Sequence, residues 1–576
     1  MKLEPLTEEI PQHLARYITQ QNPALYTPID HACWRFILKL SKAFFEAHAH
    51  QKYLNGLKET GISIERIPLI EEMDRCLRRF HWRAVPVSGF IPPAAFMEFL
   101  SLGILPIACD MRTLEHIAYT PAPDIVHEAA GHAPIITDPE YAAYLRSYGE
   151  ISKKAISSLE DLQVYEAIRQ LSETKEDPEA TALAISQAQD ALESAIQSVT
   201  YTSEATLLSR MGWWTFEYGL FGSLSHPKIY GAGLLSSLSE SFHYLDEHVA
   251  KLPFHINCTD IAYDITRPQP QLFVAPDFNT LRESLLELGN QMAFRRGGVE
   301  GLSKAIQCKT VTTTVLDTGI QISGVLSKIY QNAAGEPIYL NFTGPTQLSF
   351  ADEEIPDHGT TYHSAGFGTP LTKIGSANLE RKKLQPGNRT ELLLDSGIKV
   401  EGHLEKILLH SDQPSILTFT NCTVSYGSEI LFRPEWGTYD MVCGKGVTSV
   451  FGGPADRKKF GVPQNLSKTA ARAQKSYLSS TKQSLCHLYQ TVRTLRETPP
   501  ARSQIAQHLE QIHLELESKH PLDWLLRFEL LEILSEHALK PTWESRLTER
   551  LREIGKTSSD QWELIQRGME LLKRSH

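Results

Sequence analysis

The chain has 576 residues, of which 41% are hydrophobic and 22% are charged, as is ordinary for a globular protein of several domains. Its formal net charge of −11 argues against a nucleic-acid partner or an anionic membrane surface, since both attract basic proteins. There is no run of about 18 apolar residues and no apolar core of a secretory signal at the start. The eight cysteines form no CxxC pair, so we expect reduced thiols in a cytoplasmic protein.

The first 300 residues mix helical patterns with proline-rich loops. Apolar residues recur at helical spacing over residues 31–49, which predicts a packed helix. Residues 151–203 are rich in Ala, Ser, Glu and Gln, with a charged break that ends at Pro178, and this pattern predicts two helices in a surface insertion. We expect residues 1–305 to form one mostly helical α+β domain.

Short alternating apolar runs, such as residues 312–316 and 338–342, begin near residue 309 and predict a mostly β segment over 310–460. This segment contains an internal repeat with an offset of 78, because 8 of the 14 residues at 316–329 are identical to their counterparts at 394–407. Further on, four glycines recur at the same offset: 359, 366, 368 and 375 match 437, 444, 446 and 453. The sequence therefore predicts a duplicated all-β module whose glycines serve turns and bulges.

Residues 465–576 regain helical periodicity, with an apolar stripe at 524–531 and proline breaks at 499–500 and 521. We expect these helices to pack on each other, on the β module, or on a second subunit of a homo-oligomer. After residue 309 no His/Cys cluster has metal-ligand spacing. His358 and His363 are the closest His pair of the β segment, and Trp436 replaces His358 in the repeat, which weakens any metal role. We expect assembly or regulation from this half, and no catalytic group.

The strongest local signal is the segment PDIVHEAAGHAP at residues 123–134, in which His127 and His132 are five residues apart. This is not the HExxH motif, and on a continuous α-helix two such histidines point in different directions. Gly131 and Pro134 are typical of a helix C-terminus, which would turn His132 back toward His127. A shared metal and a helix histidine followed by a capping histidine are both compatible with this segment alone.

Glu217 is a candidate third ligand, because it lies among aromatic residues where an uncompensated carboxylate is costly to bury. Its alternative role is an exposed carboxylate on an edge strand. Two histidines and one carboxylate suit a facial Fe(II) site with open positions, and the same set also accepts a catalytic zinc.

Four segments in register, residues 119–124, 127–134, 213–220 and 230–237, resemble the pterin-dependent aromatic amino-acid hydroxylases. The resemblance covers roughly residues 20–300 and implies that family's catalytic domain, with His127, His132 and Glu217 as iron ligands. The gap from His132 to Glu217 is 85 residues, longer than is usual in the family, and the insertion at 151–203 accounts for the excess.

The resemblance also implies roles for residues around the iron. Arg112, which would otherwise be interpreted as a solvated surface residue, matches the arginine that holds the substrate carboxylate. Positions that match the lining of the amino-acid pocket are Thr120, Pro123, Trp213, Gly233 and Ser236. Positions that match the pterin site are Gly89, Phe90, Ile91, Phe96 and Glu128.

The implied reaction is ring hydroxylation of an aromatic amino acid with Fe(II), a tetrahydropterin and O2, with L-phenylalanine as the expected substrate and tyrosine as the product. Trp213 stands where tryptophan-specific members have a smaller phenylalanine, which disfavours an indole. Tyrosine or tryptophan hydroxylation, a zinc hydrolase with the same triad, and a non-enzymatic binding or scaffold protein remain as alternatives. We expect a chain of residues 1–305 to keep its activity within about tenfold.

Overall fold

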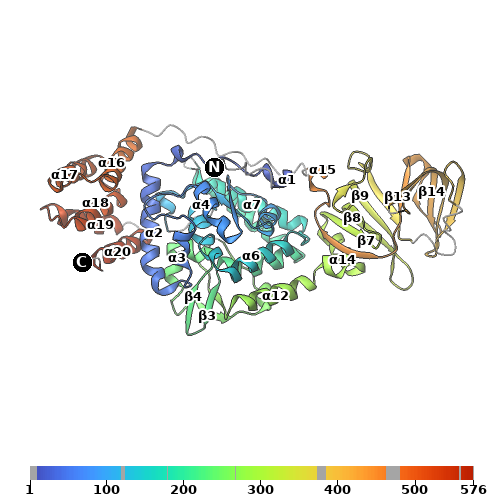
Figure 1. Cartoon of the computed structure of the whole chain (residues 1–576), viewed down its shortest axis with the longest axis horizontal. Coiled ribbons are helices and arrows are strands. Elements are labelled where there is room, and N and C mark those ends of the chain that lie inside the picture. Colours follow the sequence, from blue (N-terminus) through green and yellow to red (C-terminus); the bar gives the residue numbers. More distant parts are fainter. Residues whose placement is uncertain are drawn as a thin grey trace.

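The computed structural model describes residues 10–118, 123–177, 180–265, 267–372, 384–410, 412–461, 480–556 and 559–574. The molecule is elongated, with the strands of residues 311–452 at one end, the helices of residues 480–574 at the other, and a mainly helical central part between them (Figure 1). We call the two ends the β region and the C-terminal helices. None of the helices in the described part of the chain has the length and apolar content of a membrane span.

Helix α2 (Pro28–His48) is the helix predicted over residues 31–49. Thr27 begins it with a capping box, in which its hydroxyl accepts from the Asp30 amide and the Asp30 carboxylate accepts from the Thr27 amide. The other α-helices of the central part are α1 (Gln12–Ala15), α3 (Tyr53–Glu59), α4 (Ile70–Leu77), α5 (Pro93–Ser101), α6 (Pro139–Ser152), α7 (Leu159–Glu176), α8 (Ala182–Gln197), α9 (Glu204–Gly212), α10 (Ala232–Ser236), α11 (Leu238–His243), α12 (Phe278–Asn290), α13 (Ala293–Arg296) and α14 (Gly298–Cys308).

Helices α7 and α8 are the two helices predicted for residues 151–203, and they pack on each other through a small apolar cluster of Leu171, Ala188 and Leu192. Two small sheets complete the central part. Strands β1 (Arg83–Val87) and β2 (Ile104–Ala108) are parallel, and the second sheet has the order β4-β3-β6-β5. The bounds of the latter strands are β3 (Leu220–Ser223), β4 (His226–Ile229), β5 (Ala250–Pro253) and β6 (Gln271–Ala275).

The β region contains two antiparallel sheets that begin with equivalent hairpins. Strands β7 and β8 pair Val311 with Val325, and β12 and β13 pair Arg389 with His403, so both partners are shifted by the 78 residues of the sequence repeat. The strands are β7 (Val311–Leu316), β8 (Ile320–Gln331), β9 (Pro337–Phe350), β10 (Glu353–Glu354), β11 (Gly366–Pro370), β12 (Arg389–Leu393), β13 (Ile398–His410), β14 (Gln413–Tyr426), β15 (Glu429–Phe432), β16 (Tyr439–Val442) and β17 (Val447–Gly452).

The two repeats are not separable units. One sheet has the order β10-β9-β8-β7-β17 with β11 on β9, and the other has the order β12-β13-β14-β15 with β16 on β14. The last strand, β17, therefore follows the second repeat in sequence but pairs with β7 of the first. The matched glycines also differ in place, since Gly366 begins β11 with a φ of 131° whereas Gly444 packs against Leu316.

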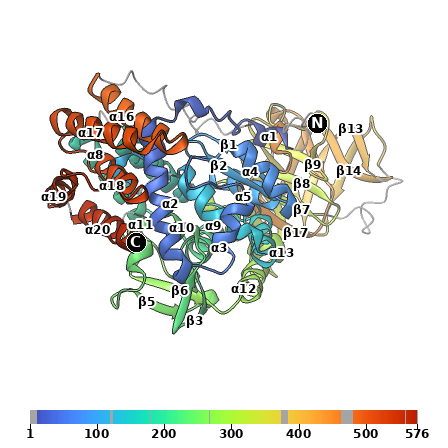
Figure 2. The same cartoon turned by 60° about the vertical axis from the view of Figure 1, so that its left-hand side comes forward.

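The C-terminal helices are α16 (Ser480–Glu497), α17 (Arg502–Lys519), α18 (Leu525–Glu536), α19 (Glu544–Gly555) and α20 (Ser559–Arg574), and α15 (Arg457–Phe460) follows the β region. Helices α16 to α20 pack on each other, as predicted. They also pack on α2 of the central part, which the sequence did not indicate (Figure 2). The Phe36 ring of α2 lies 5.1 Å from that of Trp524 and 5.0 Å from that of Phe528. Beside it, Arg35 pairs with the buried Glu532. An apolar stripe shows that a helix needs a partner but does not identify that partner.

The β region docks at the other end of the central part. Arg457 pairs with Glu98 at 2.6 Å and donates to the Lys153 carbonyl at 2.9 Å, and the Gly452 amide donates to the Lys154 carbonyl. Short 3-10 turns, labelled η, complete the fold: η1 (Pro23–Leu25), η2 (Arg78–Phe80), η3 (Leu114–His116), η5 (Ile135–Thr137), η7 (Ile256–Asp260) and η9 (Pro434–Trp436).

Candidate active site

His127 and His132 lie on one π-helical segment, η4 (Val126–His132). The prediction that a helix ends between them is wrong, because the Ala133 amide bonds to the Glu128 carbonyl five residues back and the turn continues through His132. Bonds from i to i+5 place residues five apart nearly above one another, and the two imidazole rings are only 4.9 Å apart between centroids. Gly131 serves close packing, since a Cβ atom there would lie 2.8 Å from the Ala232 carbonyl oxygen of α10.

Glu217 faces both histidines from a second π-helical segment, η6 (Trp213–Glu217). Its two carboxylate oxygens lie 3.3 Å from His127 Nε2 and 3.3 Å from His132 Nε2. The alternative role as an edge-strand carboxylate is therefore wrong. Of the three candidate ligands, His132 is fully buried, and neither of its ring nitrogens has a hydrogen-bond partner among the described residues.

The electrostatics of the three residues follow from their proximity. Burial opposes the charge on His127, but the Glu217 carboxylate outweighs it and raises the pKa of His127 to about 9. Burial likewise favours a neutral Glu217, but the two histidines hold its pKa far below the ordinary value. Burial raises the pKa of the neighbouring Glu128. Two imidazoles and one carboxylate converge here, and the buried ring nitrogens of His132 have no hydrogen-bond partner among the described residues. This set of donor atoms fits a divalent iron.

Ser236 fixes the orientation of His127. Its hydroxyl donates to the Ala232 carbonyl at 2.8 Å, so its oxygen is left to accept a hydrogen bond from Nδ1 of His127 at 3.0 Å. That bond places the Nδ1 proton on the side away from Glu217 and directs Nε2 toward the carboxylate. Such an outer hydrogen bond is the usual means by which proteins orient a metal-binding imidazole.

Arg112 is buried, contrary to its appearance from sequence alone as a solvated residue. Its Nε and Nη2 atoms donate to the two carboxylate oxygens of Asp124 at 2.8 and 2.9 Å, and Nη1 donates to the Ser236 carbonyl at 2.9 Å. Three of its five N–H groups thus bond to described residues, and the other two have no partner among these and can bind an anion. Asp124 also accepts from the His127 amide at 3.0 Å, so one carboxylate aligns both Arg112 and the start of η4.

Trp213 is clamped between two tyrosines. Its ring stacks on Tyr218 at 4.5 Å and on Tyr263 at 4.2 Å between centroids, and its Nε1 donates to Gln269 at 3.2 Å. Gly233 of α10 lies against the same element, because a Cβ atom there would lie 3.0 Å from the Glu217 carbonyl oxygen. Trp213 therefore begins η6 and Gly233 packs against its end, next to Glu217.

The predicted pterin residues fall on the loop after β1, on α5 and, for Glu128, on η4. Gly89, Phe90 and Ile91 are partly exposed in that loop, and Phe96 packs on the main core from α5. The Gly89 amide donates to the Asp110 carboxylate at 3.3 Å, and the Ile125 amide donates to the Asp110 carbonyl at 2.7 Å. Asp110 thus connects the Gly89 loop to the residue directly before η4.

Two predicted residues are less well defined. Thr120 lies outside the described residues, and Pro123 is half-buried directly before Asp124. Sequence reasoning missed the roles of Asp124 and Asp110. Neither could have been found from the local sequence, because burial of Arg112, and hence its need for a carboxylate partner, is visible only in the fold.

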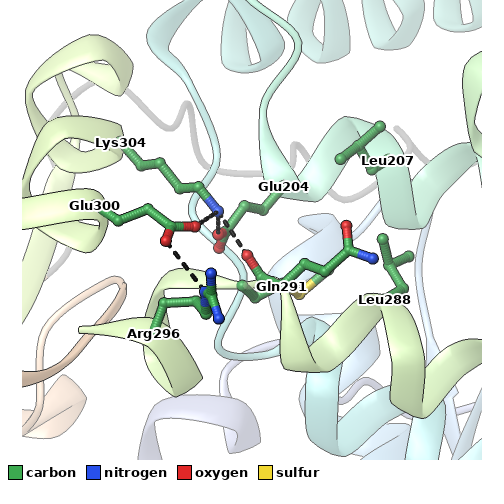
Figure 3. A pocket seen from close by; sticks show the side chains of 8 residues that line it. Glu204, Leu207, Leu288, Gln291, Arg296, Glu300 and Lys304 are labelled. Carbon is green, nitrogen blue, oxygen red and sulfur yellow. Dashed lines mark hydrogen bonds and ion pairs between the residues drawn. The ribbon is translucent and has the colours of Figure 1, made fainter. Parts of the chain in front are cut away.

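A pocket of about 390 Å³ lies elsewhere, between α9, α12 and α14. In Figure 3, Lys304 points toward Glu204 and Glu300, with nitrogen–oxygen distances of 3.1 and 3.7 Å, and Arg296 pairs with Glu300. Its charged side chains bind one another, and it contains none of the predicted site residues.

Comparisons with known proteins show the family of the chain. The sequence model of the biopterin-dependent aromatic amino acid hydroxylases matches residues 12–175 and 184–333, more than half of the chain. The chain therefore belongs to this family. Among relatives, phenylalanine-4-hydroxylase of Pseudomonas aeruginosa is 30% identical over 274 residues, which cover 47% of this chain and 87% of that protein. The enzyme of the same name from Ralstonia nicotianae is 28% identical over 289 residues, covering 48% of this chain and 78% of that protein.

Two crystal structures of phenylalanine hydroxylase from Chromobacterium violaceum are also similar. One, with bound iron(III) and 7,8-dihydrobiopterin, is 24% identical, covers 48% of this chain and 85% of that chain, and gives a TM-score of 0.38. The other, bound to iron and phenylalanine, is 23% identical, covers 48% and 87% of the two chains, and gives a TM-score of 0.36.

Proposed function

We propose that this chain is a phenylalanine 4-hydroxylase that uses Fe(II), a tetrahydropterin and O2 to convert L-phenylalanine into tyrosine. The observation that carries the proposal is the convergence of His127, His132 and Glu217 within 3.3 Å contacts in a chain of this family. The names of its relatives as phenylalanine-4-hydroxylases support the choice of substrate.

In this proposal His127, His132 and Glu217 hold the iron, which supplies the activation of O2 when bound. Ser236 keeps the Nε2 lone pair of His127 directed at the metal. The Glu217 carboxylate raises the pKa of His127 to about 9, so His127 would have to give up a proton to hold the iron.

The substrate is oriented by Arg112. Its two unused N–H groups suit the two oxygens of an amino-acid carboxylate, and Asp124 holds the guanidinium in place by a bidentate pair. This fixed orientation presents the aromatic ring to the metal in one direction. Pro123 and Gly233, with Thr120 from its place in the sequence, would complete the pocket wall. The pterin would be received by Gly89, Phe90, Ile91, Phe96 and Glu128.

Trp213 favours phenylalanine over tryptophan. Since its ring is held on both faces by Tyr218 and Tyr263, it cannot rotate away to admit an indole. A steric excess of this kind is worth about 1–3 kcal/mol, or about 10- to 200-fold in kcat/KM. A higher kcat/KM for tryptophan would refute this preference and point to a tryptophan hydroxylase.

The test is oxygen uptake and tyrosine formation by Fe(II)-loaded protein with phenylalanine and tetrahydrobiopterin. We expect coupled turnover, and its loss in Glu217→Ala with the circular dichroism spectrum retained. A zinc hydrolase with the same triad would bind zinc tightly, consume no oxygen and not be activated by ferrous iron. A binding protein would show no turnover with either metal.

We also propose the division of the chain into a catalytic domain (1–305, with the insertion at 151–203), a duplicated β module (310–460) and a helical tail (465–576), acting in the cytoplasm. The end of α14 at Cys308 supports a boundary a few residues later than 305. Assembly as a homo-oligomer through the C-terminal half is supported by Leu514 and Leu522, which are 63% and 70% exposed on the C-terminal helices. Light scattering of the full chain tests this assembly.

A further inference from the structure

A second group of metal-ligating side chains lies in the β region. His358 and His363 lie between β10 and β11, in the first repeat, and Asp440 lies on β16, in the second. One ligand atom of each lies within 4.8 Å of the other two, and all three residues are at most 7% exposed. The sequence prediction of no metal-ligand cluster after residue 309 missed this group, because Asp440 comes from the other repeat.

The distance between the two histidines matches that between two ligands of one ion. Nδ1 of His358 lies 3.2 Å from Nε2 of His363. Nitrogens bound about 2.0–2.1 Å from a tetrahedral metal are separated by about 3.3–3.4 Å. A metal could therefore bind both nitrogens with almost no movement of the side chains.

Asp440 is a buried carboxylate without an ion-pair partner among the described residues. The Thr418 hydroxyl donates to its Oδ1 at 2.7 Å and the Tyr362 hydroxyl also hydrogen-bonds to it, but no lysine or arginine of the described chain forms an ion pair with this carboxylate, which is 4% exposed. A buried carboxylate without a cationic partner is costly. A bound cation would supply the missing positive charge.

The surroundings keep both histidines neutral. Tyr362 packs on His358 and His363, with ring centroids at 5.6 and 4.7 Å, and Phe367 packs on His363 at 5.1 Å. Burial lowers the pKa of both histidines and so favours the neutral imidazole, in which each ring has one nitrogen with a lone pair. Neutral imidazole is the form that binds transition metals.

We propose that His358, His363 and Asp440 form a second metal site, for a divalent ion of the zinc class, that cross-links the two repeats of the β region. Two imidazoles and one carboxylate fill three positions of a tetrahedral zinc, and water fills the fourth. The second repeat has no equivalent site, because Trp436 and Met441 occupy the positions that correspond to His358 and His363 at the offset of 78. Its role is structural, since it joins a loop of the first repeat to strand β16.

The test is the zinc content of the full chain, stripped with a chelator, loaded with Zn²⁺ alone and desalted. The iron site also accepts zinc, so we expect two ions in the wild type, one in Glu217→Ala, one in His363→Ala and none in the double variant. His403→Ala, which removes an exposed histidine of β13, is the matched control and should keep two.

Asp440→Asn provides a second variant that keeps the shape of the side chain and its bond from Thr418. It should lower the zinc content to one per chain with unchanged circular dichroism, and Co²⁺-loaded Glu217→Ala should lose its visible absorption when this change is added. The proposal is overturned if Glu217→Ala binds no zinc, or if His363→Ala and Asp440→Asn both keep two ions. In that case the two histidines simply share a hydrogen bond.

Discussion

Replacement of Ser236 by alanine removes one oxygen atom next to His127 and should weaken iron binding. In the wild type this oxygen accepts from Nδ1 of His127 at 3.0 Å, while the hydroxyl donates to Ala232. Alanine leaves the Nδ1–H of His127 without its acceptor in a buried place. It also frees the ring to rotate or to change tautomer, so that Nε2 no longer points at Glu217.

An unsatisfied buried donor costs about 1–3 kcal/mol, and loss of an outer hydrogen bond to a metal ligand usually costs about 10- to 100-fold in metal affinity. We therefore expect the Fe(II) dissociation constant of Ser236→Ala to rise about 10- to 100-fold. Anaerobic competition with a chromophoric chelator measures this constant directly, without any need for turnover.

Ser237→Ala is the matched control. Ser237 begins α11 by accepting from the Glu240 amide at 3.2 Å, so its loss should cost stability, about 1 kcal/mol, but not iron affinity. If Ser236→Ala bound Fe(II) within twofold of the wild type, or if both variants weakened it equally, the assigned role of the Ser236 hydroxyl would be wrong.

Three further results are expected. In iron-free protein the Glu217 carboxylate raises the pKa of His127 from 6.5 to about 9. The ion pair of His127 with Glu217 therefore stabilises the folded protein fully below pH 6.5, and this stabilisation is lost as the pH rises to about 9. The melting temperature should fall between these pH values, and it should fall less in Glu217→Ala. Burial raises the pKa of Glu240 from 4.5 to about 7, so the folded protein loses stability as the pH rises from 4.5 through 7. Urea unfolding should show Glu240→Gln to be more stable than the wild type at pH 8, by up to about 3 kcal/mol, but not at pH 4. A chain that ends at residue 308 exposes Phe36 and Arg35 of α2 to water, so it should bind Fe(II) but melt at a markedly lower temperature than the full chain; an unchanged melting temperature would contradict the packing of the C-terminal helices.

A chain of residues 1–305 is therefore expected to be active only while it stays folded without the C-terminal helices. The candidate iron, substrate and pterin residues all precede residue 240, but the stability of the part that carries them depends on contacts with residues after 480.

The three candidate ligands could be predicted because four segments in register resemble those of a known family, whereas their residue types alone left other roles open. The π-helical turn could not, since His127 and His132 face each other only through a bonding pattern that depends on close packing at Gly131. The buried pair of Arg112 and Asp124 was likewise hidden, because exposure is not written in the local sequence around Arg112.

The limits of the fold prediction have a common physical cause. The periodicity of apolar residues predicted helix α2 and strands β7 and β9, because these elements depend on local sequence. The pairing of β17 with β7 and the packing of α18 on α2 join segments far apart in the chain, and amphipathic patterns alone do not specify which distant surface they will cover.

The contact between α2 and the C-terminal helices has a consequence for biosynthesis. Arg35 and Glu532 are 497 residues apart, so α2 leaves the ribosome long before the helices that cover it. Closing so long a loop costs only about 2 kcal/mol more than closing one a tenth as long. The cost is instead one of time, because at about 5–20 residues per second the apolar face of α2 waits roughly half a minute or more for its partner. During that interval the nascent chain presents Phe36 to the cytosol, and we expect chaperones to bind it there.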